Sequence, residues 1–323
     1  MKKIYKSKKF IHFNIKRSEK AMKRLSELKN KKHSYTVIKG RARKRKPNKA
    51  KAPEKFSVVH NYEATISFLS NIYHSIEMHK DIYVNLEDVT EITPDAILYL
   101  LVLIQESKNR NVVFKGNAPK DKKANSIFIS SGFFDFVNSN LDRFQLPQDS
   151  SILRIKTGKN VDGDEAANIQ NFLKEHVHNI DKVKLMAIYG ILVECMSNTN
   201  EYAGKTMGSK HWWTMALHNK ETGKVLFAFV DNGVGIPSTV RKKWFDNSSD
   251  AKLLEKAAMG TYQMSGSHEK TRNKGLPQIR KYNEDGSIQN LVIVSNKGYY
   301  SVEHGIKDLE KLFAGTMIAW EFA

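Results

Sequence analysis

The alternation of helix-like and strand-like segments from Phe56 onward limits this chain to an α/β fold. The first part, of about 90 residues, is typical of a βα layer. Its apolar spacing predicts helices at 62–78, 94–107 and 121–137 and strands at 82–86 and 111–114. After a linker at 146–164, a second α/β layer with a mixed sheet is expected. Its helices are predicted at 165–176, 181–202 and near Gly275, and its strands at 211–218, 225–231, 290–295, 299–304 and 316–322.

Length and composition allow two folded domains and one further segment. The 323 residues are 40% hydrophobic and 27% charged with only seven prolines, which excludes a wholly disordered or fibrous chain. The longest apolar run, 96–104, is about half of the roughly 20 residues that a membrane span requires. The start of the chain has no secretory signal pattern. We therefore expect a cytoplasmic protein, in which the single Cys195 forms neither an internal disulfide nor a cysteine zinc site.

The net charge of +19 is confined to the N-terminal segment. Residues 1–56 contain 22 Lys and Arg but three acidic residues, and the rest of the chain contains 31 of each kind. Within this segment, 14–31 has the apolar stripe of a basic helix, and 40–55 is expected to be an extended linker. Because Lys and Arg bind phosphates by releasing counterions, we expect residues 1–55 to bind nucleic acid. An anionic membrane surface, an acidic protein and a solvated tail without a partner are the alternatives.

The predicted helix at 181–202 contains an acid and an amide one turn apart. Glu194 and Asn198 have the spacing i, i+4, so both side chains can reach the same ligand. The rest of this helix is mostly apolar, and a buried carboxylate needs a hydrogen-bond partner or a cation. Two polar residues that satisfy a neighbouring backbone are the structural alternative.

Three further motifs follow this helix in order. An apolar strand at 225–230 ends in Asp231-Asn232-Gly233-Val234-Gly235-Ile236-Pro237, where two glycines allow a ligand to approach the backbone closely. Gly275 begins a predicted helix, whose free N–H groups and dipole favour phosphate oxygens. Gly315-Thr316 begins the last strand.

The sequence of these motifs resembles the GHKL (Bergerat-fold) ATPases, the group of gyrase, heat-shock chaperone, histidine kinase and mismatch-repair families. The resemblance covers roughly residues 160–323 and implies an α/β sandwich that binds ATP and Mg²⁺. It implies that Glu194 is the general base, Asn198 the Mg²⁺ ligand, and Asp231 the acceptor of the adenine amino group. Residues 238–274 match the ATP lid of the family.

The same resemblance places further residues at the nucleotide. The family usually has two or three glycines on the phosphate side of the site, and here only Gly275 remains. Lys274 beside it is a source of positive charge for the phosphates. The hydroxyl of Thr316, at the start of the last predicted strand, is expected near the adenine. The additional nucleotide-binding residues are thus Gly233, Gly235, Ile236, Lys274, Gly275, Leu276 and Thr316.

The part before the linker, residues 56–145, resembles a sulfate-transporter and anti-sigma-antagonist (STAS) domain. The matching stretch is NLEDVTEITPDAILYL, a strand, an acidic turn and a helix, followed by VVFKGNAP and a helix ending in SGFFDFV. Members of the family that act as phosphorylation switches have a serine at the start of the helix, where this chain has Pro94. A structural or partner-binding role is therefore expected for this domain.

The two resemblances together imply a cytoplasmic ATP-binding regulator, with an arm at 1–55, a STAS-like domain at 56–145 and a GHKL domain at 160–323. Mg²⁺-dependent ATP hydrolysis would control a protein partner or a nucleic-acid complex, and the class implies an ATP-dependent homodimer. A bacterial regulatory or defence setting fits such a fusion. Two alternatives remain open: a serine protein kinase of the anti-sigma type that acts on a partner, and a non-catalytic adaptor in which ATP is structural.

Overall fold

The computed structural model describes residues 46–137, 149–177, 180–202, 211–262 and 275–322. Lys46–Ala323 form one compact unit, separate from residues 1–45. The predicted basic helix at 14–31 lies outside the described residues. The α/β class is confirmed, because the unit contains both helices and sheets with parallel and antiparallel pairing. None of the described helices has both the length and the apolar composition that crossing a membrane would require.

The first part of the unit is a small parallel sheet with helical connections. Its strands are β1 (Asn48–Lys51), β3 (Ile82–Asn85) and β5 (Phe114–Gly116), in the order β1-β3-β5. Helices α2 (Tyr62–Glu77) and α3 (Pro94–Asn109) connect them, since parallel neighbours require crossover connections. The shorter elements are the parallel pair β2 (Lys55–Phe56) and β4 (Glu91–Ile92), helix α4 (Lys122–Ser130) and a 3₁₀ helix at Phe133–Asp135.

Some boundaries in this part differ from the sequence predictions. β1 lies within the segment expected to be an extended linker, and it pairs along its whole length with β3. Its residues, Asn-Lys-Ala-Lys, lack the apolar residues from which a strand could be predicted. The strand is formed by its backbone pairing with β3. β5 begins three residues later than predicted, after Asn111 with φ 55°. α4 ends at Ser130, before Gly132 with φ 83°, and not at 137.

The second part is a five-stranded sheet in the order β6-β7-β8-β10-β9. All of its pairs are antiparallel, which corrects the expectation of a mixed sheet. β6 lies in the predicted linker at 146–164, and β9 is one strand where two were predicted. The strands are β6 (Ile152–Gly158), β7 (Trp212–His218), β8 (Val225–Asp231), β9 (Gln289–Ser301) and β10 (Gly305–Phe322). The helices are α5 (Gly163–His176), α6 (Lys182–Tyr202), α7 (Ile236–Trp244), α8 (Asp250–Ala258) and α9 (Gly275–Glu284).

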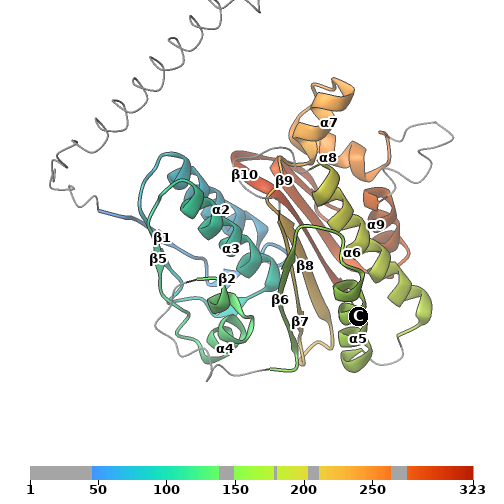
Figure 1. The fold of residues 1–323 in the computed structure, drawn as a ribbon, viewed down its shortest axis with the longest axis horizontal. Helices are drawn as coiled ribbons and strands as arrows, with labels where there is room; N and C mark the ends of the chain where they lie inside the picture. The colour runs from blue at the N-terminus through green and yellow to red at the C-terminus, as the bar shows by residue number, and fades with distance from the viewer. Residues whose placement is uncertain (1–45, 138–148, 178–179, 203–210, 263–274, 323) are drawn as a thin grey trace, which may run out of the picture. The chain divides into compact units, whose positions relative to one another are not determined.

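Helices cover both faces of the large sheet (Figure 1). α2 and α3 pack between the small sheet and one face of the large sheet, and α5, α6 and α9 pack on the other face. On α3, Tyr99 stacks on Phe313 of β10 with 3.6 Å between ring centroids, and its hydroxyl accepts a hydrogen bond from Ala314 N at 2.6 Å. The first part and the large sheet therefore share one hydrophobic core.

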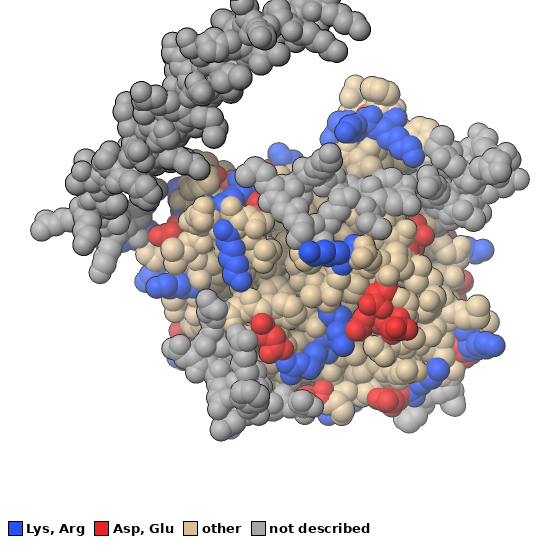
Figure 2. Space-filling model, viewed as in Figure 1, with Lys and Arg blue, Asp and Glu red and all other residues tan. Residues whose placement is uncertain are grey.

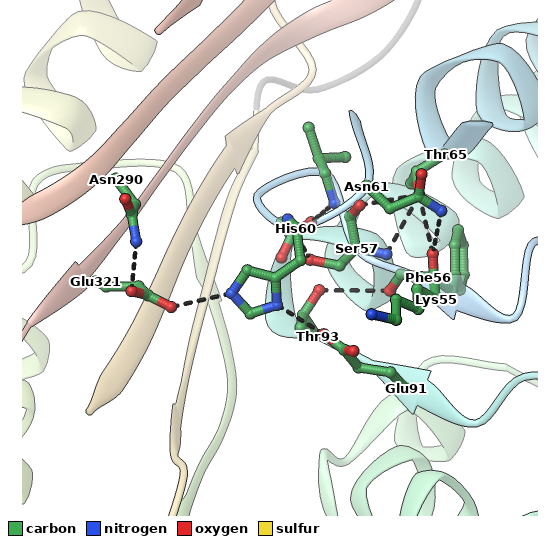
Figure 3. Close-up of polar contacts among 12 residues, drawn as sticks. Lys55, Phe56, Ser57, His60, Asn61, Thr65, Glu91, Thr93, Asn290 and Glu321 are labelled. Atoms are coloured by element: carbon green, nitrogen blue, oxygen red, sulfur yellow. Dashed lines mark hydrogen bonds and ion pairs between the residues drawn. The ribbon is translucent and has the colours of Figure 1, made fainter. Parts of the chain in front are cut away.

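A charged cluster joins the same two parts beside this core. His60 lies between two carboxylates, with Nδ1 2.6 Å from Glu91 and Nε2 3.0 Å from Glu321 of β10 (Figure 3). Glu321 is buried and also accepts from Lys224 at 2.9 Å and Asn290 at 2.6 Å. The hydrogen bond between His60 and Glu321 raises the pKa of the imidazole to about 9 and lowers the pKa of the carboxyl to about 2.

Candidate functional site

A pocket lies at the end of β8, on the face of the large sheet that α6 and α9 cover. Its walls come from α6, β8 and the loop after it, α7, α9 and β10. Of the ten residues that the sequence places at a nucleotide, nine line this one pocket, and Lys274 lies outside the described residues. The nine are Glu194, Asn198, Asp231, Gly233, Gly235, Ile236, Gly275, Leu276 and Thr316.

Asp231, the last residue of β8, is held in the pocket by the sheet itself. It is paired with Thr316 of β10 on one side and Trp212 of β7 on the other. Its Oδ1 accepts a hydrogen bond from Gly233 N at 2.7 Å. Burial raises the pKa of this carboxyl to about 7, while the N–H groups of Gly233 and Thr316 act in the opposite direction. Above neutral pH, Asp231 therefore presents an ionised acceptor inside the pocket.

The turn after β8 requires glycine at position 235. Gly235 has φ 89°, in the left-handed region, and a Cβ there would lie 2.4 Å from Oδ1 of Asn296. Asn296 fills this space because it binds the turn: Oδ1 accepts from N and Oγ of Ser238 at 3.2 and 3.0 Å, and Nδ2 donates to Val234 O at 3.0 Å. One side chain of β9 thus fixes both ends of the loop.

Ser295 supports the same loop from the neighbouring position. Its Oγ accepts a hydrogen bond from Ile236 N at 3.0 Å and lies 3.0 Å from both Gly315 O and the Thr316 hydroxyl. The sequence predicted Ser295 at the end of a strand, and it did not identify Ser295 or Asn296 as residues that support the pocket. The sequence signal for them was Ser-Asn-Lys-Gly at 295–298, where polar residues and a glycine interrupt two apolar runs.

Glu194 and Asn198 lie one turn apart on α6, and both reach the pocket. The first residue of α9 packs directly against this acid, since a Cβ on Gly275 would lie 1.7 Å from Glu194 Cγ. The first N–H groups of a helix lack partners within the helix, and its positive dipole end attracts anions. A carboxylate, an amide and a helix N-terminus therefore meet in one part of the pocket.

Cys195 also lines the pocket, but its thiol is not suited to nucleophilic chemistry. It is buried, and burial raises its pKa well above the ordinary value, with the nearby Glu194 and Asp231 acting in the same direction. Among the described residues, no three His, Cys, Asp or Glu side chains lie together in a way that could hold a metal ion. Mg²⁺ that accompanies a nucleotide needs only one or two protein ligands beside the phosphates, and the Asn198 amide oxygen can supply one.

The end of α7 adds a cation and an aromatic ring that the sequence did not single out. Lys243 and Trp244 line the pocket, and the Trp244 ring lies 5.7 Å from that of Tyr262. Lys and Arg side chains gather where α7 lies (Figure 2), and the last turn of this helix contains Arg241, Lys242 and Lys243. The segment expected to match an ATP lid, 238–274, thus contains all but the first two residues of α7 and the whole of α8, and its residues 263–274 lie outside the described residues.

The pocket as a whole combines a buried carboxyl, a glycine turn and the N-terminus of α9. These groups can bind the edge of a base, the flat face of a ring and phosphate oxygens, respectively. Comparison of the chain with models of known protein families and with curated protein sequences gave no match. Geometry and chemistry are therefore the grounds for assigning a ligand.

Proposed function

We propose that this pocket binds ATP with Mg²⁺, and that the chain is an ATP-binding regulator with an ATPase module of the GHKL type. One observation carries the proposal. Four segments that are distant in the sequence, at 194–198, 231–236, 275–276 and 316, line a single pocket. Their residue types and order resemble the GHKL motifs, with one glycine in place of the usual two or three on the phosphate side.

The adenine end of the proposed site is the end of β8. The Asp231 carboxylate is buried and fixed by two neighbouring strands, so it can accept a hydrogen bond from the amino group of the base. Gly233 has no side chain, so the base can approach the backbone there, whereas the space beside Gly235 is filled by Asn296. Phe229 and Ile318 add an apolar wall for the ring faces.

The phosphate end is the place where α6 meets α9. The N-terminus of α9 at Gly275 and the ammonium of Lys243 favour phosphate oxygens, and Asn198 would hold Mg²⁺. Magnesium supplies charge neutralisation of the phosphates when it is bound. Glu194 would take a proton from the attacking water as the water oxygen bonds to the terminal phosphorus. The bond to the bridging oxygen then breaks, and ADP and phosphate leave.

We further propose that the first part of the compact unit is a STAS-like module that receives a protein partner, in a cytoplasmic regulator that dimerises with ATP. The order β3, α3, β5 agrees with this module, and α3 begins at Pro94, which has no hydroxyl to phosphorylate. Residues 1–55, with their excess of Lys and Arg, are proposed to bind nucleic acid.

The proposal is tested by calorimetric titration of ATP at pH 8, where Asp231 is ionised, with and without Mg²⁺. Asp231→Asn replaces a pure acceptor by an amide that can present a donor to the adenine amino group. We expect it to weaken binding by about 1 to 3 kcal/mol, or about 5- to 150-fold. Asp285→Asn, an exposed acid outside the pocket, is the matched control and should bind ATP as the wild type does. Equal affinity of both variants would contradict the assignment of the adenine end.

The products distinguish the proposed ATPase from its two alternatives. Release of ADP and phosphate by the wild type supports hydrolysis. Transfer of labelled phosphate to a protein partner would instead identify a kinase, and unchanged ATP after prolonged incubation would identify an adaptor. Binding of ATP is common to all three outcomes, so a failure of catalysis leaves the site assignment intact.

A further inference from the structure

The small parallel sheet has one face that no described element covers. Its apolar residues Ile82 and Val84 are buried in the core with α2 and α3, and Ala50 and Phe114 pack at the edge of the same core. The alternate residues of each strand point to the opposite face. Parallel sheets are normally covered on both faces. An open face on such a sheet therefore needs an explanation.

The open face presents one aromatic residue between two lysines. Lys49 of β1 pairs in register with Tyr83 of β3, and Tyr83 pairs with Lys115 of β5. Neighbouring strands are about 4.8 Å apart, so the two lysine Cα atoms lie roughly 10 Å apart with Tyr83 between them. Both lysines are exposed and Tyr83 is partly exposed. Lys51 and Asn85 form the next row.

No ion pair within the described residues neutralises the charge of this row. Neither Lys49 nor Lys115 forms an ion pair with any described residue, whereas Lys51 in the next row pairs with Asp88 at 2.7 Å. The partly exposed ring of Tyr83 also makes no ring contact with another described aromatic residue. Two uncompensated cations and one available ring therefore face outward together.

We propose that this face binds single-stranded nucleic acid, with a base stacked on Tyr83 and phosphates bound by Lys49 and Lys115. An aromatic side chain on an open sheet, flanked by cations, is the arrangement that receives unstacked bases and the adjacent backbone. A duplex offers phosphates but no free base face. The proposal does not depend on the ATP pocket. It also goes beyond binding by the charge of residues 1–55, because it adds the ring of Tyr83 and the cation of Lys115, which lie in one row with Lys49.

The test measures binding of the full chain to labelled oligouridine, oligothymidine and a duplex of the same length by fluorescence anisotropy. Tyr83→Ala should weaken binding of the single strands about 5- to 100-fold, the usual effect of losing one stacked base. Tyr83→Phe keeps the ring and should retain wild-type affinity. Tyr189→Ala, on the exposed side of α6, is the matched aromatic control and should have no effect. The two single strands show whether the site prefers RNA or DNA.

The lysines are tested by the salt dependence of the same binding. Each phosphate contact on a single strand contributes about 0.7 to the slope of log affinity against log salt, so Lys49→Ala with Lys115→Ala should reduce the slope by about 1.4. Lys174→Ala with Lys281→Ala, two exposed lysines elsewhere, should leave it unchanged. Ultraviolet cross-linking of oligouridine to the wild type should modify Tyr83.

Three results would overturn the proposal. The first is wild-type affinity of Tyr83→Ala for single strands, and the second is a loss of duplex affinity in Tyr83→Ala that equals its loss of single-strand affinity. The third is binding to vesicles of anionic phospholipid that Tyr83→Ala abolishes without any effect on nucleic acid. Circular dichroism verifies the fold of each variant, and the paired lysine variants decide the matter if Tyr83→Ala does not fold.

Discussion

Asn296 shows how a single residue can determine the shape of a pocket loop that lies about 60 positions away in the sequence. Its amide makes three hydrogen bonds to Val234 and Ser238, and its own φ of 52° is tolerated better by Asn than by most residues. The turn that contains Gly235 has no other described side chain that binds both of its ends.

Asn296→Ala should therefore loosen this turn and place Ala in a left-handed conformation. We expect the free energy of unfolding to fall by about 1 to 2 kcal/mol, and ATP to bind more weakly because the loop is no longer fixed. Urea denaturation and calorimetry measure the two effects. Asn296→Asp keeps the acceptor for Ser238 but loses the donor to Val234, so it should give intermediate values. ATP affinity equal to that of the wild type in both variants would remove this role of Asn296.

At the scale of elements, the contact between α6 and α9 determines the geometry of the proposed phosphate end. Gly275→Ala should push α9 away from Glu194, because the new Cβ has no room, and should lower ATP affinity. Gly190→Ala, on the exposed side of α6 with open space around it, is the matched control. It should raise the free energy of unfolding by about 0.5 to 1 kcal/mol, since Ala favours the helix. Thermal unfolding and calorimetry test both variants.

The sequence predicted best the bounds of those elements whose own residues have a clear apolar pattern. α6 and β8 were predicted within one residue of the observed bounds, because one has a long helical apolar pattern and the other is a continuous apolar run. β1 was missed because it is polar and forms only where β3 offers a partner. The motif residues were predicted together at one site, and nine line one pocket. Ser295 and Lys243 escaped prediction because their positions depend on tertiary contacts.

At the scale of the whole molecule, the His60 cluster makes the association of the small part and the large sheet depend on pH. The raised pKa of His60 means that its contribution is complete below the ordinary value of 6.5 and disappears as pH rises through about 9. The lowered pKa of Glu321 means that its contribution is complete above the ordinary value of 4.5 and disappears as pH falls towards about 2. Both residues therefore contribute most to stability between pH 4.5 and pH 6.5.

We expect wild-type stability to fall by about 1 kcal/mol between pH 6.5 and 9.5 through this cluster, a small amount because His60 is partly exposed to solvent. His60→Ala should lack this part of the pH dependence, and Glu321 should remain paired with Lys224 and Asn290. Urea denaturation of both proteins across this range measures the difference. Parallel curves for the two proteins would show that the cluster does not contribute.

Tyr99 can stack on Phe313 only after most of the chain has been synthesised. The hydrogen bond beside it joins residues 215 positions apart, so α2 and α3 leave the ribosome long before β10 exists. Until then, the apolar face that they later place on the large sheet has nothing to pack against. Contacts this distant form slowly, and an uncovered face of this kind attracts chaperones or other nascent chains. The N-terminal part therefore completes its folding only after β10 has been synthesised.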